Sequence, residues 1–312
     1  MQVSSDSPRA RWAGILCGLG SALIWGAFPV VTRLGITQQA LDAYDITFIR
    51  YTVAGLILLP YLLRRGLMGL SWKAAALMVA GIGAPYMLVV SLGLALAPVE
   101  QFAVVTPGSM IVFAALISAC GSRALPPARE TAGLALIVAG IALAGMQAFA
   151  ASRTPPQAYA IFLAGGLMWA AYTVMSRRSA ASALHATAVV SVFSMALYAP
   201  PYLAARGLAL LHAPWPDILL QALYQGVLVS TVALFLFSQS VRLLGPATGA
   251  TFAALVPGSA TLLAAVMLGE HPGAPLLAGL AIVTAGMALT LLRPARTRGK
   301  RGPDGTTIVT RP

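Results

Sequence analysis

Charged residues are scarce in this sequence, and their scarcity excludes an ordinary soluble protein. Only 9% of the 312 residues are charged, whereas 59% are hydrophobic and the mean hydropathy is +0.84. Soluble domains usually carry about 25% charged residues. Apolar segments of about 20 residues, the length that spans a bilayer, recur along most of the chain with short polar breaks between them. The sequence therefore predicts an integral membrane protein embedded in a lipid bilayer.

Cysteine and histidine are also rare, and their positions exclude several kinds of site. Cys17 and Cys120 lie in separate apolar segments with no second thiol nearby, so neither a disulfide framework nor a metal site is indicated. His185, His212 and His271 fall near predicted helix ends, without a spacing suited to metal binding or catalysis. No reactive cluster of His, Asp, Ser or Cys appears. We therefore expect no enzyme activity, no metal and no cofactor.

Basic residues outnumber acidic ones, but they are scattered between apolar segments rather than gathered in one patch. The net charge of +12 therefore does not indicate a nucleic-acid partner. The first apolar segment is too long for the core of a cleaved signal peptide and is expected to remain as an anchor. Ten segments are predicted to span the membrane, at about 12–32, 45–64, 72–94, 98–119, 129–148, 157–176, 184–205, 217–241, 246–268 and 272–292.

The positions of the basic residues test this count of ten. With a cytoplasmic N-terminus, sixteen of the twenty Lys and Arg lie on the cytoplasmic side, Arg33, Arg153 and Arg206 lie outside, and Arg50 lies within a helix. This is the bias of the positive-inside rule. We therefore expect a multi-pass protein of the plasma membrane, the inner membrane in a bacterium, with cytoplasmic tails at 1–11 and 294–312. The second tail is basic and is expected to be disordered.

The two halves of the chain repeat each other. Residues 132–143, AGLALIVAGIAL, return at 278–289 as AGLAIVTAGMAL, and WGAFPVVTR at 25–33 matches WAAYTVMSR at 169–177. TPGS at 106–109 likewise matches VPGS at 256–259. Because each half holds an odd number of helices, the halves face opposite ways. The sequence predicts an all-α protein of ten transmembrane helices in two inverted five-helix repeats, 12–150 and 151–293.

Paired glycines mark one face of the fifth helix in each repeat. Gly133 and Gly140 are two helical turns apart, and so are Gly279 and Gly286. In lipid, a stripe of small residues lets a neighbouring backbone come close. Both stripes are therefore predicted to be helix-packing surfaces.

These features together resemble the ten-helix EamA-type members of the drug/metabolite transporter superfamily. The residues that carry the resemblance are Trp25 and Gly26, Arg50 with Ala54, Pro107 and Pro257, Gly269 and Glu270, and the glycine stripes. The resemblance implies a carrier, monomeric or a weak homodimer, that exports amino acids or other small metabolites through a central cavity between its halves. The first half departs from the pattern, with Gly121 and Ser122 where the second half has Gly269 and Glu270.

Two prolines at matching positions indicate a first candidate site. Pro107 and Pro257 each remove a backbone hydrogen bond near the middle of a predicted helix. Broken helices at corresponding positions of inverted repeats are typical of a transport site. Ser109 and Ser259 lie beside them and are candidates for substrate binding. A purely structural kink is the alternative.

Arg50 is the second candidate because a cation within a membrane helix costs up to about 3 kcal/mol and needs a partner. Glu100 is predicted at a similar depth, so we predict a contact between Arg50 and Glu100. In one hypothesis Arg50 binds a substrate carboxylate or gates the outer mouth. In the other, the two residues form a static ion pair.

Polar and aromatic side chains supply the remaining candidates for the cavity wall. The eighth helix is unusually polar, and Tyr224, Thr231 and Ser238 would share one stripe at a spacing of seven. Of its polar residues, Gln225 and Thr231 are expected to line the cavity, with interhelical hydrogen bonds as the alternative. The aromatic candidates, for which core packing is the alternative, are Trp25, Tyr86, Trp169 and Tyr172.

These observations predict a secondary transporter that rocks its two halves about a midplane site near Pro107 and Pro257. Its substrate is expected to be a small polar molecule such as an amino acid, and export is the favoured direction. No carboxylate lies clearly at mid-membrane, so Glu100 is the only candidate proton carrier. The absence of a clear mid-membrane carboxylate also argues against the efflux of cationic drugs. A non-transporting scaffold, which would have no hydrated cavity, is the other alternative.

Overall fold

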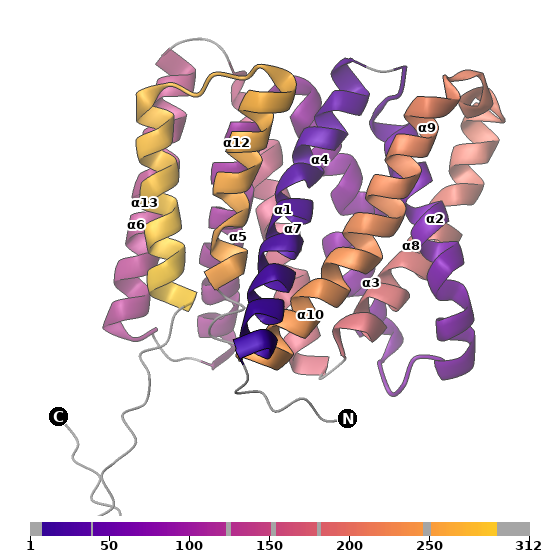
Figure 1. The fold of residues 1–312 in the computed structure, drawn as a ribbon, viewed down its shortest axis with the longest axis horizontal. Helices are drawn as coiled ribbons and strands as arrows, with labels where there is room; N and C mark the ends of the chain where they lie inside the picture. Colours follow the sequence, from indigo (N-terminus) through magenta and orange to yellow (C-terminus); the bar gives the residue numbers. More distant parts are fainter. Residues whose placement is uncertain are drawn as a thin grey trace, which may run out of the picture.

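The computed structural model describes residues 8–38, 40–122, 126–150, 154–179, 182–245 and 251–291, and these residues form a helical bundle without strands (Figure 1). The predicted tail at 294–312 and residues 1–7 of the predicted tail at 1–11, with Arg123 and Arg153, lie outside the described residues, whereas residues 8–11 belong to the first helix. The first half consists of α1 (Pro8–Thr37), α2 (Ala43–Arg65), α3 (Trp72–Ile82), α4 (Ala84–Leu96), α5 (Val99–Ser122) and α6 (Ala128–Ala150).

The second half repeats this order with more breaks. It consists of α7 (Pro156–Ser179), α8 (Ala183–Arg206), the short 3₁₀ helix η1 (Ala209–His212), α9 (Trp215–Gln221), the π-helix η2 (Ala222–Val232), α10 (Ala233–Leu244), α12 (Val256–Leu268) and α13 (Ala274–Leu291). Helices α3 and α4 form one spanning segment, and α9, η2 and α10 form another. In the described part of the chain, nine segments are long and apolar enough to cross a membrane, and α13 is a shorter apolar helix. The predicted all-α fold is thereby confirmed.

Helix α1 crosses the whole bundle, so its first and last residues mark the two opposite ends of the molecule (Figure 1). We call the end at which α1 begins the near end and the end at which it finishes the far end. Helix α5 starts at the far end with Val99 and returns to the near end, as does α7 with Pro156. The segment between α12 and α13, which carries Glu270, therefore lies at the far end.

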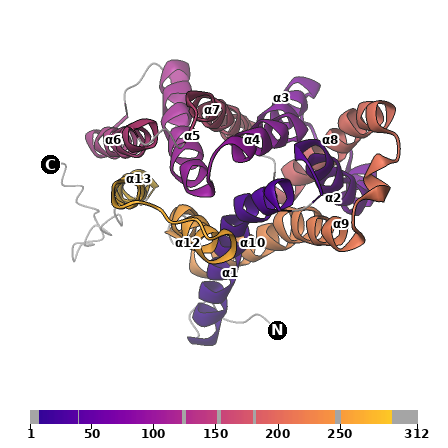
Figure 2. The ribbon, with the colours of Figure 1, turned by 90° about the horizontal axis from the view of Figure 1, so that it is seen from above.

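The glycine stripes of the two repeats pack against each other. Helices α6 and α13 lie side by side at one edge of the bundle (Figures 1 and 2). A Cβ added at Gly140 would stand 2.7 Å from the carbonyl oxygen of Gly279, and one added at Gly133 would stand 2.9 Å from that of Gly286. Backbones at this distance leave no room for a methyl group, which explains why both helices need glycine at these turns.

The third helices of the two halves are both irregular near the middle. In the first half, Gly83 separates α3 from α4, and Pro85 stands in the first turn of α4. The freed backbone N–H of Ala84 donates to Ser194 Oγ on α8 at 3.1 Å. In the second half the irregularity is η2, where a π-helical segment replaces the α-helix. Such segments in membrane helices survive where neighbouring helices satisfy the backbone, and π-helices are frequent at functional sites.

Candidate functional site

Arg50, on α2, lies inside the bundle and faces α1 and the π-helix η2. Its Nη1 donates to Gln225 Oε1 at 3.1 Å and lies 3.9 Å from the sulfur of Met87. Its guanidinium carbon stands 5.0 Å from the ring centre of Phe28 and 5.6 Å from that of Tyr51. The charge is therefore held by two aromatic rings and one amide rather than by an anion.

The positive charge of Arg50 is not neutralised within the described part of the chain. The ion pairs found there join Arg33 or Arg206 to carboxylates, and Arg50 takes part in none of them. Its Nε is buried without a hydrogen-bond partner. A partly buried cation with a free donor and no counter-ion is suited to a ligand that brings its own negative charge.

The π-helix η2 positions the partner of Arg50. Gln225 is fully buried, and its Nε2 donates to Thr32 Oγ1 on α1 at 2.9 Å, which orients Oε1 toward Arg50. Because a π-helix has more residues per turn than an α-helix, the spacing of seven that predicted one stripe no longer returns to the same face. Tyr224 donates to the Ile24 carbonyl on α1 at 2.7 Å, while Thr231 Oγ1 is buried without a partner.

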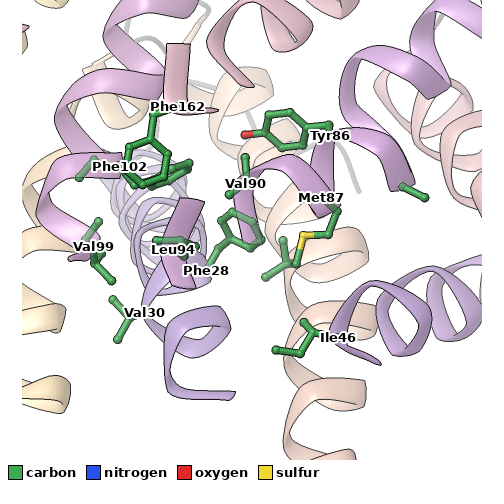
Figure 3. Close-up of a cluster of buried hydrophobic side chains, with 14 of the residues drawn as sticks. Phe28, Val30, Ile46, Tyr86, Met87, Val90, Leu94, Val99, Phe102 and Phe162 are labelled. Carbon is green, nitrogen blue, oxygen red and sulfur yellow. The ribbon is translucent and has the colours of Figure 1, made fainter. Parts of the chain in front are cut away.

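The aromatic candidates lie in three places. Tyr86 is buried near Arg50 and packs edge-to-face on Trp169, with ring centres 6.2 Å apart, so these two belong to the surroundings of Arg50. Figure 3 shows Tyr86 on the same side of the buried cluster as Met87. Trp25 packs instead on Phe237, at 5.2 Å between ring centres. Tyr172 packs against Gly81 of α3.

The proline sites differ between the halves. Helix α5 continues through Pro107, whereas the ninth membrane segment, Thr251–Leu268, breaks at Leu255, two residues before Pro257. The neighbouring serines pack on glycines of the opposite half. Ser109 fills the space beside Gly166 of α7, and Ser259 fills the space beside Gly26 of α1.

Both serines donate to backbone carbonyls. Ser259 Oγ donates to the Ala22 carbonyl at 3.2 Å, and Ser109 Oγ donates to the Thr106 carbonyl at the same distance. The first bond joins α12 to α1, whereas the second stays within α5.

Glu100 does not contact Arg50, and it lies in a different cluster at the far end. There Arg33 Nε stands 2.7 Å from Glu270 Oε1, and the Arg33 guanidinium also donates to the carbonyls of Leu94 and Ala97. Glu270 Oε2 accepts from the Val99 backbone N–H at 2.9 Å. Glu100, the next residue, lies within hydrogen-bonding reach of Glu270. We name Arg33, Glu100 and Glu270 the far-end cluster.

The predicted pairing of Arg50 with Glu100 fails because depth along a helix does not determine which way a side chain points. The sequence predicts Arg33 outside the membrane and offers Glu270 only as part of the family resemblance, yet together they tie α1 to the segment before α13. Their opposite charges at the same predicted depth were the signal that sequence reasoning missed. For Phe28 and Thr32, which help to hold Arg50 and Gln225, no signal distinguished them from other residues of an apolar helix.

A second set of acid–arginine contacts closes the far end between α2 and α8. Arg206 Nη1 stands 2.6 Å from Asp42 Oδ2, and Tyr202 donates to Asp45 Oδ1 at 2.5 Å. Asp42 also caps α2, together with Asp45, through a capping box. Both far-end arginines of the described chain therefore meet carboxylates.

The near end has an arginine at the position that matches Arg33, but no glutamate at the position that matches Glu270. Arg177 corresponds to Arg33 in the repeat alignment, and Gly121 with Ser122 stands where the far end has Gly269 with Glu270. Arg178 packs over Gly121, and a cavity of about 260 Å³ opens here between α5 and α7. Its lining consists of Ser118, Gly121, Val174, Arg177 and Arg178.

Burial along α5 differs between its two halves. Every residue from Val99 to Ser109, the far half of the helix, is buried, whereas every residue from Met110 to Ala115 is partly accessible. The far half packs into the main core, where Phe28, Phe102 and Phe162 meet edge to face (Figure 3). The bundle is therefore packed more tightly around the far half of α5 than around its near half.

Comparison with known proteins identifies both halves. The model of the EamA-like transporter family matches residues 12–146 and again residues 157–292. Among solved structures, one crystal structure of a protein has a TM-score of 0.55 and 22% sequence identity, over 90% of this chain and 97% of its own. This likeness concerns the fold. No curated protein matches the chain.

Proposed function

Because the chain belongs to the EamA-like transporter family, we propose that it is a secondary transporter that moves a small polar metabolite by alternating access between its two inverted repeats. Both repeats contribute to the surroundings of Arg50, since α1, α2 and α4 come from the first and η2 and α7 from the second. A site shared by both halves is one that a rocking motion exposes to each side in turn.

The uncompensated charge of Arg50 supports a substrate that carries a carboxylate, such as an amino acid. The guanidinium has a free buried Nε and no anionic partner in the described residues. A carboxylate is a suitable ligand for it because two parallel N–H donors match two oxygens. The aromatic surroundings, Phe28, Tyr51 and Tyr86, supply apolar contacts for the rest of a small molecule. The same positive charge argues against cationic drugs as cargo.

The packing of the two ends supports export as the direction. With the topology predicted from the basic residues, the near end faces the cytoplasm. The far half is closed and the near half of α5 is accessible, so this conformation would load its cargo from the cytoplasm. A scaffold without transport activity has no use for a partly buried, unpaired cation between its two halves.

The proposal is tested by profiling metabolites in the medium of cells that overproduce the protein or the Arg50→Gln variant. We expect carboxylate-bearing metabolites to accumulate with the unmodified protein. The variant should raise the KM for export roughly tenfold or more, because a charge-assisted hydrogen bond contributes about 1.5–3 kcal/mol. Arg50→Lys should retain only part of the export activity, because lysine keeps the positive charge but lacks the two parallel N–H donors of the guanidinium.

Arg242→Gln, which removes an exposed arginine from the last turn of α10, is the matched control and should export normally. All variants must reach the membrane in equal amounts. Equal export by Arg50→Gln and the unmodified protein would exclude Arg50 as the substrate-binding group.

A further inference from the structure

The far-end cluster contains two carboxyl groups and one guanidinium. The Arg33 guanidinium is already engaged, since its Nε meets Glu270 Oε1 at 2.7 Å and its Nη1 donates to two backbone carbonyls. The second oxygen of Glu270 accepts from the Val99 N–H. The charge of Glu270 is therefore balanced within the cluster, and that of Glu100 is not.

Glu100 is poorly placed to remain ionised. The residue is 7% exposed, and its Oε2 is buried without a hydrogen-bond partner. The carboxyl of Glu270 lies within hydrogen-bonding reach. Two carboxylates that share a buried site do not both stay charged, and an unpaired buried charge costs several kcal/mol. A hydrogen bond between two carboxyl groups also requires one of them to hold a proton.

We propose that Glu100 and Glu270 form a proton-binding site that takes up one proton when the far end closes and releases it when the far end opens. The cluster joins four elements, namely α1, the end of α4, the start of α5 and the segment before α13. Opening of the far end must separate them. Water then reaches both carboxyl groups, and both ionise.

The other titratable and charged groups around Glu100 are few. Arg33 faces it from α1, and Tyr159 faces it from α7 while donating to Gln101 and to the Ala144 carbonyl. The segment before α13 supplies Glu270 and the exposed His271, whereas the end of α4 supplies backbone carbonyls. Arg33 is shared with Glu270, and Tyr159 is neutral at ordinary pH, so neither balances the charge of Glu100.

The inverted repeat makes this proton site one-sided. At the near end, Arg177 stands at the position of Arg33, but Ser122 replaces Glu270, so this position of the repeat carries no carboxyl. Closing the near end therefore takes up no proton through this motif. As a consequence, acid at the far side favours the state that is closed there, whatever the cargo is.

The test measures the far-end opening directly, so it does not depend on the substrate or on the proposed function. Spin labels are attached at Thr37→Cys, at the end of α1, and at Ala274→Cys, at the start of α13, with Cys17 and Cys120 replaced by serine. The distance between the labels is measured by pulsed electron resonance from pH 5 to pH 9. We expect the ratio of open to closed protein to rise about tenfold per pH unit across the transition, as linkage to one proton requires.

Glu100→Gln, which mimics the protonated side chain, should stay closed at every pH. Two controls should keep the pH dependence of the labelled protein. Asp217→Asn removes another acid at the far end, in the first turn of α9, and His271→Gln removes the neighbouring histidine. A labelled protein that shows no change from pH 5 to pH 9 would overturn the proposal, and this outcome needs no variant. An unchanged pH dependence in Glu100→Gln would overturn it equally.

Discussion

At the scale of single residues, the arginines at the far end and the arginine inside the bundle have different partners. Arg33 and Arg206, at the far end, are paired with carboxylates. Arg50, inside the bundle, rests on aromatic rings and an amide. A paired arginine stabilises one arrangement of helices, whereas an unpaired one leaves its charge available to a ligand.

The pair between Arg33 and Glu270 predicts a measurable stability effect. Arg33→Gln leaves Glu270 without its counter-ion, so it should lower stability by up to about 3 kcal/mol. Thermal unfolding in detergent measures the loss. The double variant Arg33→Gln with Glu270→Gln should recover part of it, because it leaves no second carboxylate uncompensated. Arg206→Gln, in a more exposed pair, should lower stability by about 1 kcal/mol or less. Simple additivity of the two single changes would contradict the pairing.

At the scale of elements, a close backbone approach joins the last helices of the two repeats. Helices α6 and α13 meet at Gly133 with Gly286 and at Gly140 with Gly279. Contact of this kind in lipid depends on packing because lipid chains are as apolar as the side chains they replace. The pairing therefore requires small residues rather than more hydrophobic ones.

Gly140→Ala is expected to destabilise the protein for this reason. The added methyl group would stand 2.7 Å from the Gly279 carbonyl oxygen and 3.0 Å from the Val283 nitrogen, and both are backbone atoms that cannot move aside alone. Overpacking of this kind costs about 1–3 kcal/mol, which a lower midpoint of thermal unfolding would report. Gly258→Ala in α12, where nothing lies within 4 Å of the added methyl group, is the matched control. Equal midpoints for the two variants would rule out a steric role for Gly140.

At the scale of the whole molecule, the two ends are closed by unequal means. Acid–arginine contacts and the aromatic core close the far end, whereas arginines without an acid at the matching position border a cavity at the near end. A transporter that works by alternating access must break the far-end contacts in every cycle.

A reversible cross-link at the far end should therefore stop transport. We expect a bifunctional thiol reagent that joins Thr37→Cys to Ala274→Cys, in protein without other cysteines, to abolish export. A reducing agent should then restore it. Each single-cysteine variant treated with the same reagent should export normally. Full export by the cross-linked protein would show that the far end does not open between α1 and α13.

The sequence alone determined the membrane class, the ten helices, the inverted repeat and the family, because hydrophobic length, glycine spacing and repetition are local features of a chain. The residues at which helices end were predicted less accurately. Helix α1 was predicted to end at 32, but it continues to Thr37, and the contacts of Arg33 with Glu270 and two carbonyls anchor this polar last turn.

Only the tertiary structure decided which charged residues meet. Arg50 and Glu100 are predicted at a similar depth, yet Arg50 turns toward Gln225 and Glu100 turns toward Glu270. Two structural features that cannot be predicted from local sequence patterns determine these side-chain contacts. One is the π-helical turn of η2, which rotates Gln225 toward α2, and the other is the position of the segment before α13 over the end of α1. Side-chain direction depends on the rotation of each helix in the bundle, and that rotation is set by all of its neighbours at once.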